Sequence, residues 1–152
     1  MTVHVLIPYN FTRNDYRAIE FVGTHYVKQK DVEITLFHVY TPVPEIDIRD
    51  SPIMEKVAQN ASFLRLAQDE QKNLMEEAKT QLMNFGFAGH RIHCLFRPVH
   101  TDIAADIIQL WKEGKFNAVV LNRNPGNIIN FFNRSISKQV TRYIQGGVHI
   151  VN

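Results

Sequence analysis

The sequence predicts an α/β fold, in which helices cover both faces of a five-stranded, mostly parallel sheet as a three-layer sandwich. Strand-like apolar segments alternate along the chain with segments of helical periodicity, the pattern of a parallel sheet with right-handed crossovers. Two of the strand-like segments, 3–7 and 118–121, are apolar throughout except at His4. Continuous apolar strands are typical of sheets that are buried on both faces.

The first half of the chain begins with a predicted strand over 3–8. Thr12 and Asp15 resemble a capping box, and apolar residues then recur at helical spacing as far as Val27. The segment 32–40 is rich in β-branched and aromatic residues and predicts the second strand. Three prolines between 41 and 52 indicate a loop.

A long helix is predicted from near Ser62 to Phe85, ended by Gly86 and Gly89. Its predicted buried stripe consists of Leu74, Ala78, Leu82 and Phe85. The segment 91–96 predicts the third strand.

We expect Thr101 to cap the next helix, which Gly114 ends. The apolar residues of this helix share one face and are Ile103, Ile107, Leu110 and Trp111. The fourth strand is predicted over 118–121 and the fifth over 148–151. The helix between them opens at Ser135, and its expected buried residues are Ile136, Val140, Tyr143 and Ile144. With no internal repeat or composition break, residues 1–152 form one predicted domain.

Composition and charge exclude several classes of partner. The formal net charge is +2 with scattered basic residues, which argues against nucleic acid and anionic membranes as partners. No apolar run reaches the roughly 20 residues that span a bilayer. We expect no signal peptide, because the N-terminus enters a strand pattern directly. Cys94 is the only cysteine, so no intrachain disulfide forms and a cytoplasmic location is expected.

The segment from Ala118 to Ser137 has the order strand, polar loop and helix N-terminus. In α/β proteins this order places backbone N–H groups and the positive end of a helix dipole where phosphate binds. Arg123, Asn124, Ser135 and Ser137 are therefore candidates for an anion pocket. The alternative is that Ser135 is an ordinary N-cap and the asparagines form the loop.

These motifs resemble the universal stress protein family over essentially the whole chain. The family ends its first strand in Pro-x-Asp, and this chain has Pro8-Tyr9-Asn10. The family's second strand ends in Leu-x-His-Val, which Leu36-Phe37-His38-Val39 matches. A short capped turn before the third helix corresponds to Pro98-Val99-His100-Thr101-Asp102. The resemblance and the doubly wound pattern together imply the strand order 3-2-1-4-5 of the adenine nucleotide alpha hydrolase-like fold.

The ATP-binding signature of that family is altered in this chain. Its pattern, G-x2-G-x9-G-[ST], falls on Leu121, Asn124, Arg134 and Ser135, so all three glycines are replaced. Glycine serves where φ is positive or where a ligand touches the backbone, and Asn124 is the mildest replacement because asparagine tolerates the left-handed region. Asn10 replaces the aspartate that contacts the nucleoside. The resemblance therefore implies weak or no binding of ATP or another phosphate compound. The candidate ligand residues are Pro8, Asn10, Val39, Arg123, Asn124, Arg134, Ser135 and Ser137.

No residue set demands an enzyme or a metal. His93 and Cys94 are adjacent on a strand and point to opposite faces, which argues against a zinc site with His90. His38 is expected to be a packed histidine rather than a catalyst, and Glu76 and Glu77 a solvated face. P-loop, G-x-G-x-x-G and G-x-S-x-G motifs are absent from the sequence.

Three functions remain open. The resemblance favours a stress-response regulator with a remodelled nucleotide site that acts through an unknown protein partner. The alternative is a sensor that binds ATP or another nucleotide through residues 122–137. An enzyme such as a nucleotide hydrolase is the weakest reading, because no base or metal set is recognisable.

The final strand predicts a homodimer. Family members commonly pair through this strand, and its apolar edge has unpaired backbone groups with which another strand can pair. The expected interface residues are Val148, His149, Ile150 and Val151.

Overall fold

The computed structural model describes residues 2–11, 15–40, 52–122, 134–144 and 147–151, and for residues 52–67, 122 and 134–137 it describes the backbone alone. Its elements in chain order are β1 (Val3–Pro8), α1 (Tyr16–His25), β2 (Val32–Tyr40), α2 (Pro52–Phe85), the 3-10 turn η2 (Gly89–Arg91), β3 (Ile92–Pro98), α3 (Ile103–Gly114), β4 (Ala118–Asn122), α4 (Arg134–Tyr143) and β5 (Val148–Val151).

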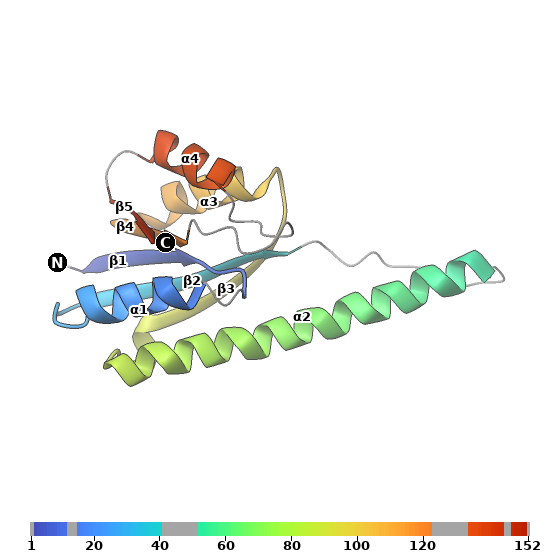
Figure 1. Cartoon of the computed structure of the whole chain (residues 1–152), viewed down its shortest axis with the longest axis horizontal. Coiled ribbons are helices and arrows are strands. Elements are labelled where there is room, and N and C mark those ends of the chain that lie inside the picture. The colour runs from blue at the N-terminus through green and yellow to red at the C-terminus, as the bar shows by residue number, and fades with distance from the viewer. Residues whose placement is uncertain (1, 12–14, 41–51, 123–133, 145–146, 152) are drawn as a thin grey trace.

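The five strands form one parallel sheet in the order β3-β2-β1-β4-β5, which confirms the predicted topology. Val3 of β1 lies opposite Val32 of β2, and Val5 lies opposite Ala118 of β4. Helices α1 and α2 lie on one face of the sheet and α3 and α4 on the other (Figure 1). The three-layer sandwich is therefore confirmed.

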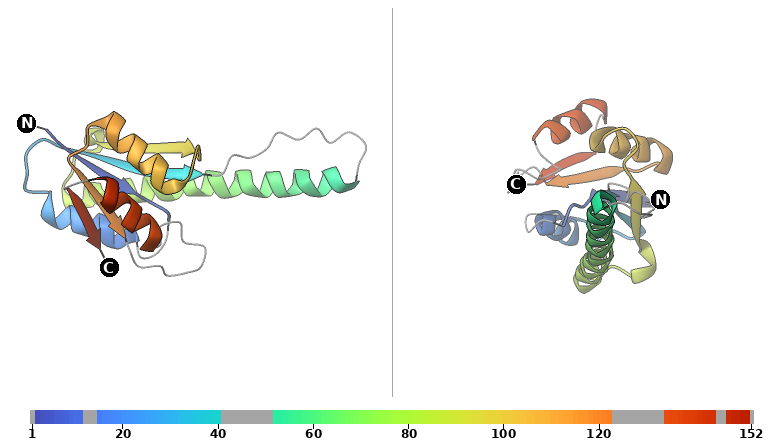
Figure 2. Two further views of the ribbon diagram at one scale, coloured as in Figure 1. Left: turned by 90° about the horizontal axis from the view of Figure 1, so that it is seen from above. Right: turned by 90° about the vertical axis from the view of Figure 1, so that its right-hand side faces the viewer.

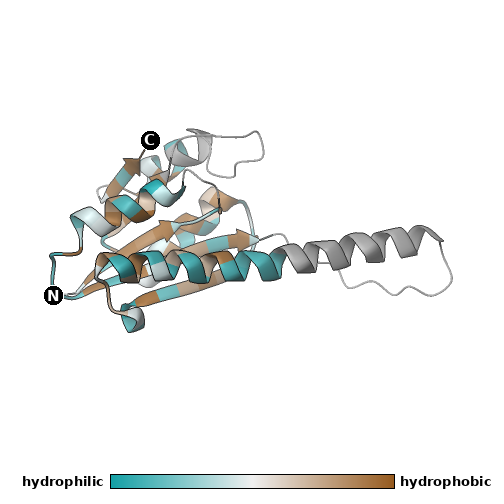
Figure 3. Ribbon diagram, turned by 60° about the horizontal axis from the view of Figure 1, so that its bottom comes forward, coloured by the Kyte–Doolittle hydropathy of each residue, from teal (hydrophilic) through white to brown (hydrophobic). Residues whose placement is uncertain are grey.

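Each face of the sheet has its own core. One apolar cluster lies between the sheet and helices α1 and α2, and the other lies under α3 and α4. Strand β1 contributes to both, because Val5 and Ile7 belong to the first cluster and Leu6 to the second. All three side chains are fully buried. Figure 3 shows the apolar strands that the described half of α2 covers.

Helix α2 begins earlier than predicted. Its first residue is Pro52, ten positions before the expected start near Ser62. Proline fits the first helical turn, where its missing N–H has no intrahelical partner, so Pro52 starts the helix instead of closing the loop. At 34 residues α2 is about 51 Å long, whereas the nine residues of β2 span about 30 Å. The N-terminal part of α2 consequently extends past the sheet (Figure 2).

The buried stripe of α2 differs slightly from the predicted one. Met75, Ala78 and Leu82 are buried, while Leu74 and Phe85 are half-buried. Phe85 packs so closely on α1 that a Cβ at Gly23 would lie 2.4 Å from its ring. Gly23 is thus the contact point between the two helices.

Three terminal details differ from the predictions. Asp102, not Thr101, caps α3, because its Oδ1 accepts a hydrogen bond of 2.8 Å from the N–H of Ala105. Asp15 occupies the N-cap position of α1 without a capping bond, and its predicted partner Thr12 lies outside the described residues. In α4, Val140 and Ile144 are buried as expected, but Tyr143 is 66% exposed. Tyr143 lies three residues beyond Val140, at the edge of the narrow stripe that a short helix buries.

His38 is a buried polar side chain within this apolar interior, which agrees with the predicted packing role. Its Nδ1 donates a 2.9 Å hydrogen bond to the carbonyl oxygen of Tyr9. The rings of Phe11 and Phe96 lie against it, with centroid distances of 4.6 and 5.9 Å. Burial lowers the pKa of His38, although the Tyr9 carbonyl, Asp15 and Gln71 act in the opposite direction.

We expect His38 to make the fold less stable in acid. Because its pKa is lower in the folded chain, the unfolded chain binds more protons as pH falls through the ordinary histidine value of about 6.5. The His38 contribution is complete above that pH and declines below it. Urea unfolding from pH 7.5 to pH 5, about the range in which histidine titrates, measures this slope. His38→Asn retains a donor for the Tyr9 carbonyl and should flatten the slope.

The matched control is His90→Asn, which replaces an exposed histidine. This variant measures how much the loss of a histidine outside the core changes the slope. A His38→Asn variant with the same slope as the parent would contradict the assignment.

Candidate functional site

The carboxyl ends of β1, β2 and β4 meet at one edge of the sheet. The strands are parallel and β1 lies between the other two. The chain runs from β1 to β2 on one side, while β4 lies on the other side, so the strand order reverses at β1. In open α/β sheets a crevice forms at such a switch point, and ligands bind there.

Two of the predicted ligand residues, Pro8 and Val39, are at the carboxyl ends of β1 and β2. Pro8 is opposite Phe37 in the register, so Val39 is two residues farther along β2. Val39 is 7% exposed and its side chain belongs to the core under α3. Its side chain is therefore part of the packing, and only its backbone groups remain for a ligand.

Asn10 follows β1 in a turn that a buried carboxylate holds. The N–H of Asn10 donates a 3.0 Å hydrogen bond to Oδ2 of Asp15, and the N–H of Tyr9 donates to the carbonyl of Phe37 at 2.8 Å. Asp15 is 2% exposed. The turn thus has an acidic side chain beneath it, although position 10 itself has an amide.

The turn is completed by Phe11, whose backbone has φ of +61°. This left-handed conformation is unusual for a bulky side chain. The ring of Phe11 packs edge-on against Tyr9 at 5.3 Å and also contacts His38 and Phe96. Burial, with the charges of Asp15 and Glu77, raises the pKa of Tyr9 to about 12, so this phenol stays protonated. The turn is therefore packed against a cluster of aromatic rings.

Leu121 continues β4 where the nucleotide signature has its first glycine. It is 1% exposed, packs in the core under α3 and α4, and lies opposite Ile150 of β5. The strand extends one residue farther, to Asn122 opposite Val151. Position 121 is consequently a core strand position in this chain.

The remaining predicted ligand residues are only partly within the structure. Arg123 and Asn124 lie outside the described residues. Arg134, Ser135 and Ser137 belong to α4, but only their backbone is described. Since α4 begins at Arg134, Ser135 lies inside the first turn and is not the N-cap. The prediction that these residues form one site remains untested.

The structure bears on the metal and membrane expectations only for the residues that it describes. Among these residues, there is no cluster of three or more histidine, cysteine or acidic side chains that could bind a metal ion. The exposed His93 pairs with Glu33 at 2.7 Å, while Cys94 is half-buried on the α2 side of the sheet. In the same residues no helix is long and apolar enough to cross a membrane.

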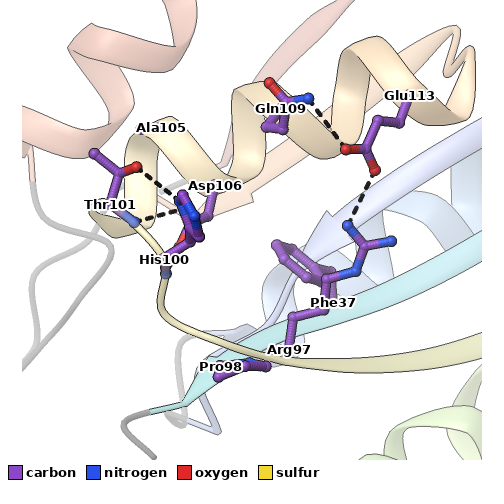
Figure 4. A pocket seen from close by; sticks show the side chains of 9 residues that line it. All are labelled: Phe37, Arg97, Pro98, His100, Thr101, Ala105, Asp106, Gln109 and Glu113. Atoms are coloured by element: carbon purple, nitrogen blue, oxygen red, sulfur yellow. Dashed lines mark hydrogen bonds and ion pairs between the residues drawn. The ribbon is translucent and has the colours of Figure 1, made fainter.

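A hollow lies between α3 and the strands β2 and β3 (Figure 4). Its volume is about 580 Å³. The described residues that line it are Phe37, Arg97, Pro98, His100, Thr101, Ala105, Asp106, Gln109 and Glu113. Sequence reasoning missed its charged residues, because Arg97 and Glu113 are sixteen positions apart and meet only in the fold. The turn at 98–102, which belongs to the family resemblance, was the one available signal.

No protein-family model matches the chain, and no curated protein sequence matches it. The likeness to known proteins therefore rests on solved structures.

Several solved structures match nearly the whole chain. One is a universal stress protein in complex with cAMP, with 15% identity, a TM-score of 0.64 and coverage of 99% of this chain and 97% of that chain. Another is the universal stress protein from Archaeoglobus fulgidus in complex with dAMP, with 12% identity, a TM-score of 0.60 and coverage of 100% and 98%. A third is a universal stress protein family protein from Arabidopsis thaliana with AMP bound, with 16% identity, a TM-score of 0.62 and coverage of 98% and 90%.

The TM-scores establish the shared architecture, and identities this low leave activity open, because one fold carries many functions. The fold implied by the sequence motifs is confirmed: the chain has the fold of the universal stress proteins.

Proposed function

We propose that the chain is a universal stress protein-like regulatory protein with a remodelled nucleotide site that binds ATP weakly or not at all. It acts by binding a protein partner, in the cytoplasm, and is not an enzyme. The observation that carries the proposal is the burial of Leu121 within β4. A side chain at that position occupies the core and keeps the strand paired where the family signature has a glycine.

The turn after β1 supports the same proposal. Asn10 presents an amide where the family has a nucleoside-binding carboxylate, so it gains donors and loses a charge. The nearby carboxylate of Asp15 is buried and accepts the backbone N–H of Asn10. The negative charge at this end of β1 therefore holds the backbone turn rather than facing a ribose.

The alternative is a nucleotide sensor that uses residues 122–137. Its support comes from three similar structures, which are complexes with cAMP, dAMP and AMP. Helix α4 follows β4, so its N-terminus lies toward the carboxyl edge of the sheet, where a helix dipole favours phosphate. Arg123 and Arg134 supply positive charge in this proposal.

We expect ATP to bind more weakly than to proteins with the complete signature. The dissociation constant should exceed roughly 100 μM, which corresponds to about 5.5 kcal/mol. The measurement is calorimetric titration of ATP into refolded, nucleotide-free protein. Micromolar affinity, or ATP that co-purifies with the chain, would support the sensor and contradict the remodelled site.

Any residual anion binding should depend on the two arginines. We expect Arg123→Ala combined with Arg134→Ala to abolish sulfate or phosphate binding and to leave the circular dichroism spectrum unchanged. Arg142→Ala is the matched control, because Arg142 is exposed in the last turn of α4. If the double variant binds the anion as well as the parent chain does, the anion binds outside the predicted site.

Homodimerisation through β5 is also part of the proposal. Among the described strands, β5 pairs only with β4 and so forms an edge of the sheet. Ile150 is 38% exposed on this edge. His149 is committed to α1, because its Nε2 lies 3.2 Å from the hydroxyl of Tyr26 and its ring packs on Phe21. We therefore assign the pairing to the strand edge and Ile150 rather than to the imidazole.

We expect a dimer in sedimentation equilibrium at micromolar concentration. Ile150→Pro and Ile150→Lys should each shift it toward monomer, because proline removes a backbone donor and lysine places a charge on the apolar edge. Ile108→Lys on α3 is the control for adding a lysine at a half-buried apolar position away from β5. A parent chain that is monomeric, or a dimer that survives both Ile150 variants, would contradict this interface.

A further inference from the structure

The two outer strands of the sheet differ in length. Strand β3 forms one edge and β5 the other (Figure 1). The seven residues of β3 span about 23 Å, whereas the four residues of β5 span about 13 Å. Among the described strands, β3 pairs only with β2. Its far side is therefore the longer of the two edges at which a further strand can pair.

The register of β3 shows which of its backbone groups face outward. The N–H of Val99, directly after the strand, donates to the carbonyl of Tyr40 at 2.8 Å and so faces β2. The pairing of β3 with β2 is uninterrupted, and the backbone groups of successive residues in a strand alternate between its two sides. The N–H and C=O groups of Cys94 and Phe96 consequently face the free edge, where they are available to a further strand.

The side chains of β3 differ between the two faces of the sheet. Leu95 packs against the core under α3, whereas Cys94 and Phe96 pack against the core under α1 and α2. His93 and Arg97 lie two positions before and after Leu95, so they share its face. The edge thus has basic side chains on the α3 face and half-buried, mainly apolar side chains on the α2 face.

Each basic side chain at this edge pairs with an acid that lies farther from the edge. The pairs are Arg91–Asp31, His93–Glu33 and Arg97–Glu113, with N–O distances of 3.1, 2.7 and 3.1 Å. Two of the acids belong to β2 or directly precede it, and the third belongs to α3. The basic side chains are between 33% and 56% exposed. A guanidinium has five N–H donors, so both arginines retain donors for an acceptor that approaches from outside.

These charges discriminate among the strands that can pair with β3. Charged side chains on an edge strand normally prevent unwanted pairing. In an antiparallel pair of two β3 strands centred on Leu95, Arg97 of one copy would lie opposite His93 of a second copy. Basic groups that lie opposite each other disfavour such a pair. The edge is therefore poorly suited to self-association and suited to a strand with acidic side chains.

We propose that the free edge of β3 binds an extended segment of a protein partner that carries two acidic residues four positions apart. In an antiparallel pairing the acidic residues lie opposite His93 and Arg97, and apolar residues lie opposite Cys94 and Phe96. Antiparallel edge strands are common on otherwise parallel sheets. The backbone hydrogen bonds supply the affinity, and the side chains supply the specificity. This inference rests on the proposed function, because it specifies the chemistry of its protein partner.

Three capped peptides separate the backbone requirement from the charge requirement. The glutamate peptide, Ac-Ser-Glu-Val-Thr-Val-Glu-Ser-NH2, has the proposed pattern. The lysine peptide replaces both glutamates with lysine. The proline peptide replaces both valines with proline, which keeps the charges and removes two backbone donors.

The measurement is a titration of the full chain with each peptide, followed by 15N–1H spectra. The glutamate peptide should bind at millimolar concentration and shift the amides of Cys94 and Phe96. The lysine and proline peptides should each bind at least about tenfold more weakly, because they lose favourable cross-strand pairs or backbone hydrogen bonds.

A matched pair of variants tests the backbone contact. Cys94→Pro removes one outward N–H group, and Cys94→Ala is its control because alanine retains that group. Proline is tolerated on an edge strand where the N–H faces solvent. We expect Cys94→Pro to weaken binding of the glutamate peptide about threefold or more, measured at the Phe96 amide, and Cys94→Ala to bind like the parent chain.

A second pair of variants tests the charge and remains informative if Cys94→Pro does not fold. Arg97→Gln should weaken binding of the glutamate peptide and reduce its advantage over the lysine peptide. Lys112→Gln is the control, because Lys112 is an exposed cation in the last turn of α3, away from the β3 edge.

Several results would overturn the proposal. They are no binding of the glutamate peptide at millimolar concentration, and equal binding of the lysine or proline peptide. Equal binding by the parent chain, Cys94→Pro and Arg97→Gln would also contradict it, as would shifts at Val148–Val151 in place of β3. The ATP titration remains a separate test. Weak ATP binding without peptide binding would support the proposed function and overturn this site, whereas micromolar ATP binding with peptide binding would do the reverse.

Discussion

The burial of β1 on both faces is the constraint on which the rest of the structure depends. Val5, Leu6 and Ile7 are fully buried, and they alternate between the two cores. The backbone of such a strand can satisfy its polar groups only through neighbouring strands on each side. This requirement places β2 and β4 beside β1 and divides the helices between the two faces. Polar side chains that could contact a ligand can follow only where β1 ends. The switch point at the end of β1 is therefore a consequence of how the core is built.

Most of the architecture could be predicted because it follows from patterns within single segments. Apolar runs marked β1 and β4, and helical spacing marked the buried faces of α3 and α4. The errors occurred where a residue serves two neighbouring structures equally well. Pro52 suits both the end of a loop and the first turn of a helix, and Thr101 and Asp102 are both good caps. Only the structure decides between them, since the N–H of Ala105 donates to Oδ1 of Asp102.

The predicted site was accessible only in part from the sequence. The family signature has a glycine where this chain has Leu121, whereas the predicted strand over 118–121 included this residue, and pairing with β5 buries it in the core. Asp15 was predicted to be the acidic member of a capping box with Thr12, whereas its carboxylate accepts the backbone N–H of Asn10. The pairing of Leu121 is a tertiary contact, and the Asp15 bond forms within an irregular turn. Such contacts carry no periodic signal, which is also why the Arg97–Glu113 pair could not be found by spacing.

The length of α2 has a consequence for the behaviour of the molecule in solution. A compact chain of 152 residues has a radius of gyration of about 15 Å, and a helix about 51 Å long that passes beyond the sheet increases it. The extended helix also raises hydrodynamic friction without adding mass. An elongated single chain can therefore elute from a sizing column at the volume of a larger compact particle. For this protein, a diffusion coefficient depends on both shape and mass, whereas sedimentation equilibrium depends on mass and not on shape.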